Sequence, residues 1–218
     1  MTTLTATPLA PLLARLFTEA ASATSPAIAR YSREERARLL NSKTEYRQFY
    51  GRLKDLWLAV SPETGTLLYM LARSTGARII VEFGTSFGIS TLYLAAALRD
   101  NGGGRLITTE FEPSKVMRAK ANLAEGGLVD LVEVREGDAL ETLSADLPER
   151  IDLLLLDGAK ALYPEILSLV ESRLRPGALV IADNADFSPE YLERVRSLAG
   201  GYMSTPFGDD VELSMRLG

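Results

Sequence analysis

The 218-residue sequence contains neither histidine nor cysteine. Without cysteine there is no disulfide framework and no thiolate zinc site, and without histidine the imidazole metal ligands are missing as well. Nucleophilic catalysis by a Ser-His-Asp or Cys-His arrangement is excluded for the same reason. Proton transfer must therefore rely on Lys, Asp, Glu or Tyr, and any metal site must be built from oxygen ligands.

Long apolar runs are also missing. No stretch reaches the ~18 apolar residues that a membrane-spanning helix needs. The N-terminal segment lacks the basic start of a signal peptide, and Arg15 interrupts the nearby apolar run. We therefore expect a cytoplasmic protein with no membrane contact. The length predicts a single domain over residues 1–218, because domains mostly comprise ~100–200 residues.

Charge is unevenly distributed along the chain. Residues 1–60 contain nine basic and five acidic side chains, whereas residues 61–218 contain 15 and 24, and the net charge is −5. Two interpretations stay open. In the first, the charges of residues 1–60 and 61–218 simply belong to ordinary solvated surfaces. In the second, residues 1–60 form a basic lid over an acidic core, an arrangement that suits an anionic substrate beside a cationic cofactor.

Hydrophobic periodicity divides the chain into a helical cap (1–60) and an α/β core (61–218). In the cap, leucines at three- and four-residue spacing from Leu9 predict one helix, and Ser32 with Glu35 forms a capping box that opens another. In the core, apolar runs at 78–83, 105–110, 131–135, 151–156 and 178–182 alternate with helical stretches at 89–98, 113–125, 140–147 and 163–174. Residues 201–206 and 210–217 predict a terminal hairpin.

This alternation predicts the fold class. Strands that are apolar on both faces and separated by helices indicate a parallel sheet covered on both sides. We expect a doubly wound α/β fold whose mostly parallel, seven-stranded sheet ends in an antiparallel hairpin. Ligands of such sheets bind beyond the carboxyl ends of the strands, so the residues at those ends are the candidate site.

The ends of the first three strands suggest a nucleotide-like cofactor. A turn from Gly84 to Gly88 opens a helix whose N-terminus favours an anionic group. Glu82 beside it would repel a pyrophosphate and attract a cation, and S-adenosylmethionine (SAM) offers both a carboxylate and cationic groups. Glu110 is placed to accept from ribose hydroxyls, as in NAD and SAM sites alike. Asp138 either accepts from an adenine amino group or caps the next helix.

The ends of the last two core strands suggest a metal site. Asp157 ends one strand and precedes Lys160, while Asp183 and Asn184 end the neighbouring strand. Adjacent parallel strands lie ~5 Å apart, so these side chains should converge. Two carboxylates and a carboxamide form a half-shell of hard oxygens that suits Mg²⁺. Each feature alone would more simply be a turn or a helix cap.

Together, these motifs resemble the cation-dependent class I O-methyltransferases, the group that includes catechol and caffeoyl-CoA O-methyltransferases. The resemblance covers about 61–185 and rests on the segments 61–65, 81–90, 157–163 and 182–184 together with Glu110. It implies a Rossmann-like methyltransferase fold, with Lys160 as general base and Mg²⁺, Mn²⁺ or Ca²⁺ bound by Asp157, Asp183 and Asn184. It also implies the SAM-binding residues, which are Glu82, Gly84, Thr85, Ser90, Glu110, Phe111, Asp138, Ala139 and Asp157.

The acceptor implied by this resemblance is a small molecule with a hydroxyl group, of the catechol type or with vicinal oxygens, and the expected assembly is a homodimer. Only residues 185–200 separate the Asp-Asn pair from the terminal strands, which is shorter than is usual in the family. The aromatic residues of the cap are therefore expected to supply part of the acceptor pocket, unless they serve packing alone. They are Tyr31, Tyr46, Phe49, Tyr50 and Trp57.

Three alternative functions stay open at this point. A tRNA hydroxyuridine O-methyltransferase is favoured by the basic cap and disfavoured by the acidic net charge. An NAD(P)-dependent oxidoreductase is disfavoured by the missing third glycine and by Glu82. A non-catalytic SAM-binding module is disfavoured by the intact set of Asp157, Lys160, Asp183 and Asn184.

Overall fold

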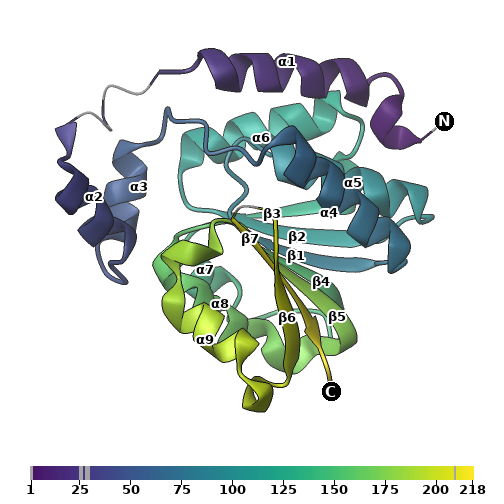
Figure 1. Ribbon diagram of the computed structural model, residues 1–218. Helices are drawn as coiled ribbons and strands as arrows, with labels where there is room; N and C mark the ends of the chain where they lie inside the picture. Colours follow the sequence, from purple (N-terminus) through teal and green to yellow (C-terminus); the bar gives the residue numbers. More distant parts are fainter. Residues whose placement is uncertain (1, 25–26, 28–29, 209) are drawn as a thin grey trace.

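A seven-stranded sheet in the order β3-β2-β1-β4-β5-β7-β6 forms the centre of the computed structural model, which describes residues 2–24, 27, 30–208 and 210–218 (Figure 1). Strands β1 to β5 run parallel, and β7 is antiparallel to both β5 and β6. The predicted doubly wound fold with a terminal antiparallel hairpin is confirmed. The strands are β1 (Ile79–Phe83), β2 (Arg105–Glu110), β3 (Val132–Glu136), β4 (Ile151–Leu156), β5 (Leu174–Ala182), β6 (Tyr202–Phe207) and β7 (Val211–Arg216).

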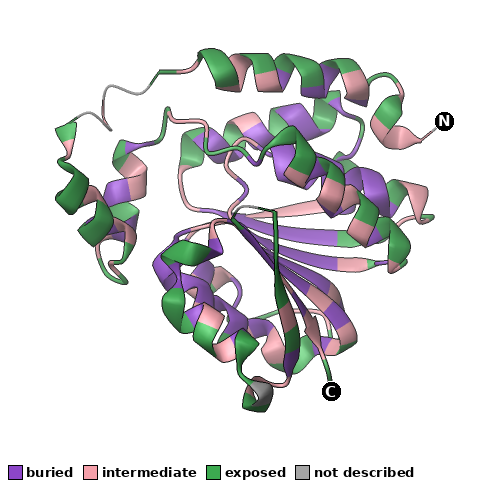
Figure 2. Ribbon diagram, in the orientation of Figure 1, coloured by how far each residue is buried: buried purple, intermediate pink, exposed green. Residues whose placement is uncertain are grey.

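Both faces of the sheet are covered by helices. The central strand β4 shows why, because Leu153 and Leu155 point into one apolar cluster while Leu154 and Leu156 point into the other. Figure 2 shows the central strands β1, β2 and β4 as mostly buried, whereas β6 at the edge of the sheet is largely exposed. One face carries α4 (Pro62–Ser74), α5 (Ile89–Asp100) and α6 (Pro113–Glu125), and the other carries α7 (Ala139–Thr142), α8 (Tyr163–Val170) and α9 (Pro189–Arg196).

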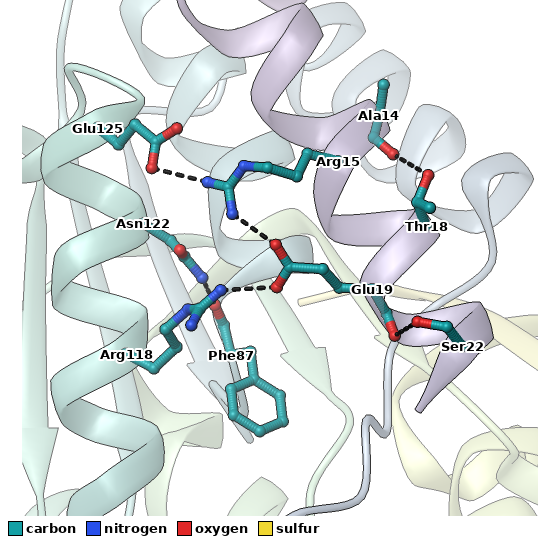
Figure 3. A network of polar contacts seen from close by, with 9 residues as sticks. All are labelled: Ala14, Arg15, Thr18, Glu19, Ser22, Phe87, Arg118, Asn122 and Glu125. Atoms are coloured by element: carbon teal, nitrogen blue, oxygen red, sulfur yellow. Dashed lines mark hydrogen bonds and ion pairs between the residues drawn. The ribbon is translucent and has the colours of Figure 1, made fainter. Parts of the chain in front are cut away.

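Helix α1 (Leu9–Ser22) packs outside α5 and α6. Its apolar face, which consists of Leu9, Leu12, Leu13 and Leu16, is buried. At the rim, Arg15 contacts Glu19 at 2.6 Å and Glu125 of α6 at 2.7 Å, and Arg118 of α6 contacts Glu19 at 2.6 Å (Figure 3). Exposed ion pairs contribute little, so burial of the leucines holds α1 in place.

Helices α2 (Arg33–Leu40) and α3 (Tyr46–Arg52) form a separate unit with its own small cluster of Leu39, Phe49 and Leu53. The predicted capping box is confirmed, since Ser32 and Glu35 each accept a hydrogen bond from the other's backbone N–H. The residues before the core thus lie in two places. Helix α1 packs on one face of the core, whereas α2 and α3 lie at the left of Figure 1, where Tyr46 and Tyr50 of α3 contact the apolar cluster of the other face. The division at residue 60 stays a prediction.

Two predicted boundaries are corrected. The helix expected over 140–147 ends at Thr142, because the Arg135 guanidinium binds the carbonyl groups of Thr142, Ala145 and Asp146 and satisfies them outside a helix. Strand β5 begins at Leu174 and not at residue 178, since it already pairs with β4 there, before an irregularity in the register. Among the helices described, none is long and apolar enough to cross a bilayer.

Candidate active site

A cavity of about 1000 Å³ lies at the carboxyl ends of the parallel strands. Its floor is formed by the residues that follow β1 to β5, and its roof by α2, α3 and the segment before α4. Ligand pockets in proteins usually measure ~300–1,000 Å³, so this cavity has room for a cofactor and a second small molecule. The cap residues that line it include Tyr46, Phe49, Tyr50 and Trp57, whereas Tyr31 packs against Phe49 instead.

The turn after β1 brings two strand ends into contact. Gly84 adopts a φ of 104°, and a Cβ atom on it would lie 2.6 Å from the carbonyl oxygen of Asp157. Only glycine fits this conformation and this approach. The glycine therefore serves close packing of β1 against the end of β4, and it lines the cavity at the same point.

Glu82 lies beneath the cavity floor and is fully buried. Its carboxylate accepts hydrogen bonds from Ser90 Oγ and Thr91 Oγ1, both at 2.6 Å. Burial raises the pKa of Glu82 to about 7. Thr85 is also buried, with its hydroxyl 2.6 Å from that of Thr108. Thr85 and Ser90 border a small hollow beside the main cavity, and Glu82 lines neither space.

The Glu110 carboxylate faces the cavity at the end of β2. One oxygen accepts from the backbone N–H of Ser86 and the other from that of Glu112, each at 2.9 Å. Burial raises the pKa of Glu110, although these hydrogen bonds oppose the shift. Nearby, the hydroxyls of Ser86 and Thr109 are buried without a hydrogen-bond partner in the described part of the chain. Both residues line the cavity and offer polar groups to a ligand.

Asp138 is a helix cap that also faces the cavity. Its Oδ1 accepts from the backbone N–H of Leu140 at 3.0 Å, so it caps α7. Its other oxygen accepts a short hydrogen bond from the Tyr46 hydroxyl of α3. This contact ties the cap to the end of β3, beside Ala139 on the cavity wall.

Asp157, Lys160, Asp183 and Asn184 converge on one part of the cavity wall. They converge because Leu156 of β4 pairs with Ala182 of β5, so that the two aspartates directly follow paired residues. The Lys160 ammonium donates to Asp157 Oδ1 at 2.9 Å and lies 4.0 Å from Asp183 Oδ2. All of these side chains reach the cavity from the ends of neighbouring strands.

The electrostatics of this group show an excess of negative charge. Burial and the nearby charge of Asp157 raise the pKa of Asp183 to about 7, although Lys160 opposes the shift. Burial lowers the pKa of Lys160, but the charges of Asp157 and Asp183 act more strongly, and the net shift is upward. A second cation in contact with both carboxylates would reverse these shifts.

Asn184 completes the group in a left-handed conformation, with φ 49° and ψ 43°. Its Nδ2 donates to Asp210 Oδ2 at 2.9 Å. Two carboxylates and one carboxamide thus face the cavity, and no cluster of three or more Asp, Glu, His or Cys side chains suited to a metal occurs among the described residues. The metal site stays a prediction.

Comparison with known proteins shows which proteins this chain resembles. A methyltransferase domain model matches residues 81–185. A catechol O-methyltransferase from Niastella koreensis is 37% identical over 130 residues, which is 58% of this chain and 58% of that protein. The match therefore spans less than two thirds of that relative's length.

Solved structures agree. The O-methyltransferase of Bacillus cereus in complex with SAH superposes with a TM-score of 0.68 at 27% identity, covering 79% of this chain and 89% of that one. The O-methyltransferase TomG of Streptomyces achromogenes, in complex with SAM, gives a TM-score of 0.64 at 28% identity, with 93% and 95% covered. The chain therefore resembles O-methyltransferases in sequence and in fold. None of these three relatives is a nicotinamide-dependent reductase or a tRNA-modifying enzyme by its description.

Lys115 is a cavity residue that the sequence analysis missed. It lines the cavity next to Glu110 and is 4% exposed. Burial lowers its pKa, although nearby carboxylates oppose the shift. Its ammonium lies 5.4 Å from the centre of the Phe87 ring, which stacks on Trp57 with centroids 4.3 Å apart. One lysine near the start of a helix carries no sequence signal that distinguishes it from a solvated side chain.

Proposed function

We propose that the protein is a SAM-dependent, divalent-metal-dependent O-methyltransferase that methylates a hydroxyl of a small acceptor with vicinal oxygens. The observation that carries the proposal is the ion-paired group of Asp157, Lys160 and Asp183 in a cavity large enough for cofactor and acceptor. A homodimer and a cytoplasmic location stay predictions.

Cofactor binding is supported by the chemistry of the cavity floor. Glu110 presents a carboxylate suited to a pair of ribose hydroxyls, and the buried hydroxyls of Ser86 and Thr109 offer further polar contacts. The cationic sulfonium and ammonium of SAM suit a floor that also exposes Asp157 and Asp138. When bound, SAM supplies the methyl group for an in-line displacement at its sulfonium.

Metal binding is supported by the donor set. Asp157, Asp183 and Asn184 offer hard oxygens, as Mg²⁺ prefers. The raised pKa of Asp183, about 7, reflects burial and its proximity to a second carboxylate, an arrangement that a dication stabilises. When bound, the ion would lower the pKa of a chelated acceptor hydroxyl.

Lys160 is the residue we assign to proton transfer. To accept the proton of the acceptor hydroxyl it must be neutral, whereas Asp157 and Asp183 hold its pKa above the usual value. Neutralising those carboxylates with a cation would release this constraint and let burial lower the pKa. The Tyr50 hydroxyl from α3 lies in the same electrostatic environment, since its pKa is raised by burial and responds to Lys160 and Asp157.

The test measures methyl transfer from labelled SAM to catechol with Mg²⁺, with and without EDTA. We expect turnover that EDTA abolishes. Lys160→Met should reduce turnover by at least about 100-fold, while a thermal shift with SAM still reports cofactor binding. Asp157→Ala should remove the response of turnover to added Mg²⁺. Lys120→Met, at an exposed residue of α6, is the matched control. Activity that survives EDTA would contradict metal dependence, and an unchanged rate in Lys160→Met would remove Lys160 from the mechanism.

A further inference from the structure

The cavity is electrostatically polarised between floor and roof. Carboxylates gather on the floor at the strand ends, including Glu110, Asp138, Asp157 and Asp183. The roof contributed by α2 instead presents two arginines, Arg33 and Arg36.

The arginines belong to one regular face of α2. Arg33, Arg36, Ala37 and Leu40 all line the cavity, and their spacing of three, four and seven residues from Arg33 is that of one helix face. Leu39 points away from this face into the small cluster with α3. The face that meets the cavity is therefore mixed, with two guanidinium groups toward the start of the helix and apolar side chains toward its end.

Neither guanidinium contacts a carboxylate within 4 Å in the described part of the chain, whereas Arg38 on another face of α2 pairs with Glu45. Arg33 is exposed and Arg36 half-buried. Guanidinium groups bind carboxylates through a planar pair of N–H donors. The cavity face of α2 thus offers donors for an anionic group that enters beside it.

The segment after α2 meets the core on the side of the reacting groups. Lys43, in the segment after α2, contacts Glu165 of α8 at 2.8 Å and Glu190 of α9 at 2.6 Å. Helices α8 and α9 follow β4 and β5, the strands that present Asp157 and Asp183. These contacts show that the chain after α2 lies beside the helices that follow the strands of Asp157 and Asp183.

We propose that Arg33 and Arg36 bind a carboxylate on the methyl acceptor, so that the preferred substrates are carboxylated aromatic compounds with vicinal hydroxyls. The proposal rests on the proposed function. In this arrangement the floor carboxylates would hold the divalent cation and the cationic groups of SAM at the reacting end. Phe49 and Leu40, which line the cavity, would lie against the ring. The arginines would bind the opposite, anionic end.

The experiment compares two acceptors of matched size, 3,4-dihydroxyphenylacetate and its uncharged amide. For the wild-type protein we expect a KM about tenfold lower for the acid, and a KM for the acid that rises with salt concentration. In the double variant Arg33→Glu, Arg36→Glu, the KM for the acid should rise about tenfold or more, while the KM for the amide changes by less than about twofold. Lys54→Glu is the control, because Lys54 is an exposed cap residue outside the cavity lining.

Calorimetry in the presence of SAH measures acceptor binding without turnover, so it distinguishes failure of acceptor recognition from failure of methyl transfer. Absence of methyl transfer to either acceptor would refute the proposed function, and the binding preference would still report on the arginines. Equal affinity of the wild-type protein for acid and amide would overturn the inference. It would also be overturned if the double variant kept the preference, or if its KM for SAM rose in place of that for the acid.

Discussion

The substitution Glu82→Gln should make the protein more stable at neutral and alkaline pH. Glu82 is fully buried, and both carboxylate oxygens accept from hydroxyl groups, those of Ser90 and Thr91. Hydroxyl groups can rotate to accept as well as donate, so a glutamine side chain can be satisfied in the same place. The substitution therefore removes a buried negative charge at nearly constant shape.

The magnitude follows from the pKa of Glu82, which burial raises from the usual 4.5 to about 7. An acid with a raised pKa in the folded state is protonated there while it is already ionised in the unfolded chain. The free energy of unfolding therefore falls as pH rises from about 4.5 to about 7 and is constant above that range. The full difference corresponds to about 3 kcal/mol, and glutamine does not incur it.

Denaturant unfolding at pH 5 and at pH 8 tests this prediction. The stability advantage of Glu82→Gln over the wild type should grow by about 2 to 3 kcal/mol between these pH values. Taking the difference between the two proteins cancels the titration of the other acids, Asp183 and Glu110 among them. An advantage that does not change with pH would refute the reasoning. If the negative charge also attracts the cationic groups of SAM, the KM for SAM should rise in the same variant.

Two further predictions concern the framework of the site. Gly84→Ala should destabilise the protein by about 2 kcal/mol or more and lower its turnover. The reason is that φ is 104° and the new methyl group would lie 2.6 Å from the Asp157 carbonyl oxygen. Unchanged free energy of unfolding and unchanged activity would contradict this. Leu16→Ala should lower the free energy of unfolding by about 2 to 5 kcal/mol, because Leu16 is fully buried in the main core. Leu40→Ala should lower the free energy of unfolding by less. Equal losses in the two variants would show that α1 is not part of that core.

The fold could be predicted because its strands are apolar on both faces. Runs such as Leu153 to Leu156 admit only a sheet with two covered faces, and Pro and Gly mark the ends of many elements. The errors lie where tertiary contacts override local pattern. Arg135 captures the carbonyl groups that would have continued α7, and the pairing of β5 with β4 extends the strand past the apolar run.

The site could be predicted from the sequence where its residues directly follow strand ends. The orientation of buried side chains and the positions of the cap helices could not. Asp157 and Asp183 converge because register on paired strands fixes their positions. Glu82 differs, since its spacing cannot reveal that its carboxylate turns toward Ser90 and Thr91 beneath the floor. The positions of α1 on the core and of α2 over the cavity depend on long-range packing, which helical periodicity alone does not encode.

If Asp157, Asp183 and Asn184 share one divalent cation beside Lys160, a Mn²⁺ titration followed by electron paramagnetic resonance detects it most directly. In the presence of SAM we predict one bound Mn²⁺ per chain, lost in the double variant Asp157→Ala, Asp183→Ala and kept in Asp186→Ala, which changes an exposed acid outside the cavity lining. No bound Mn²⁺ in the wild-type protein, or equal binding by the double variant, would contradict the account.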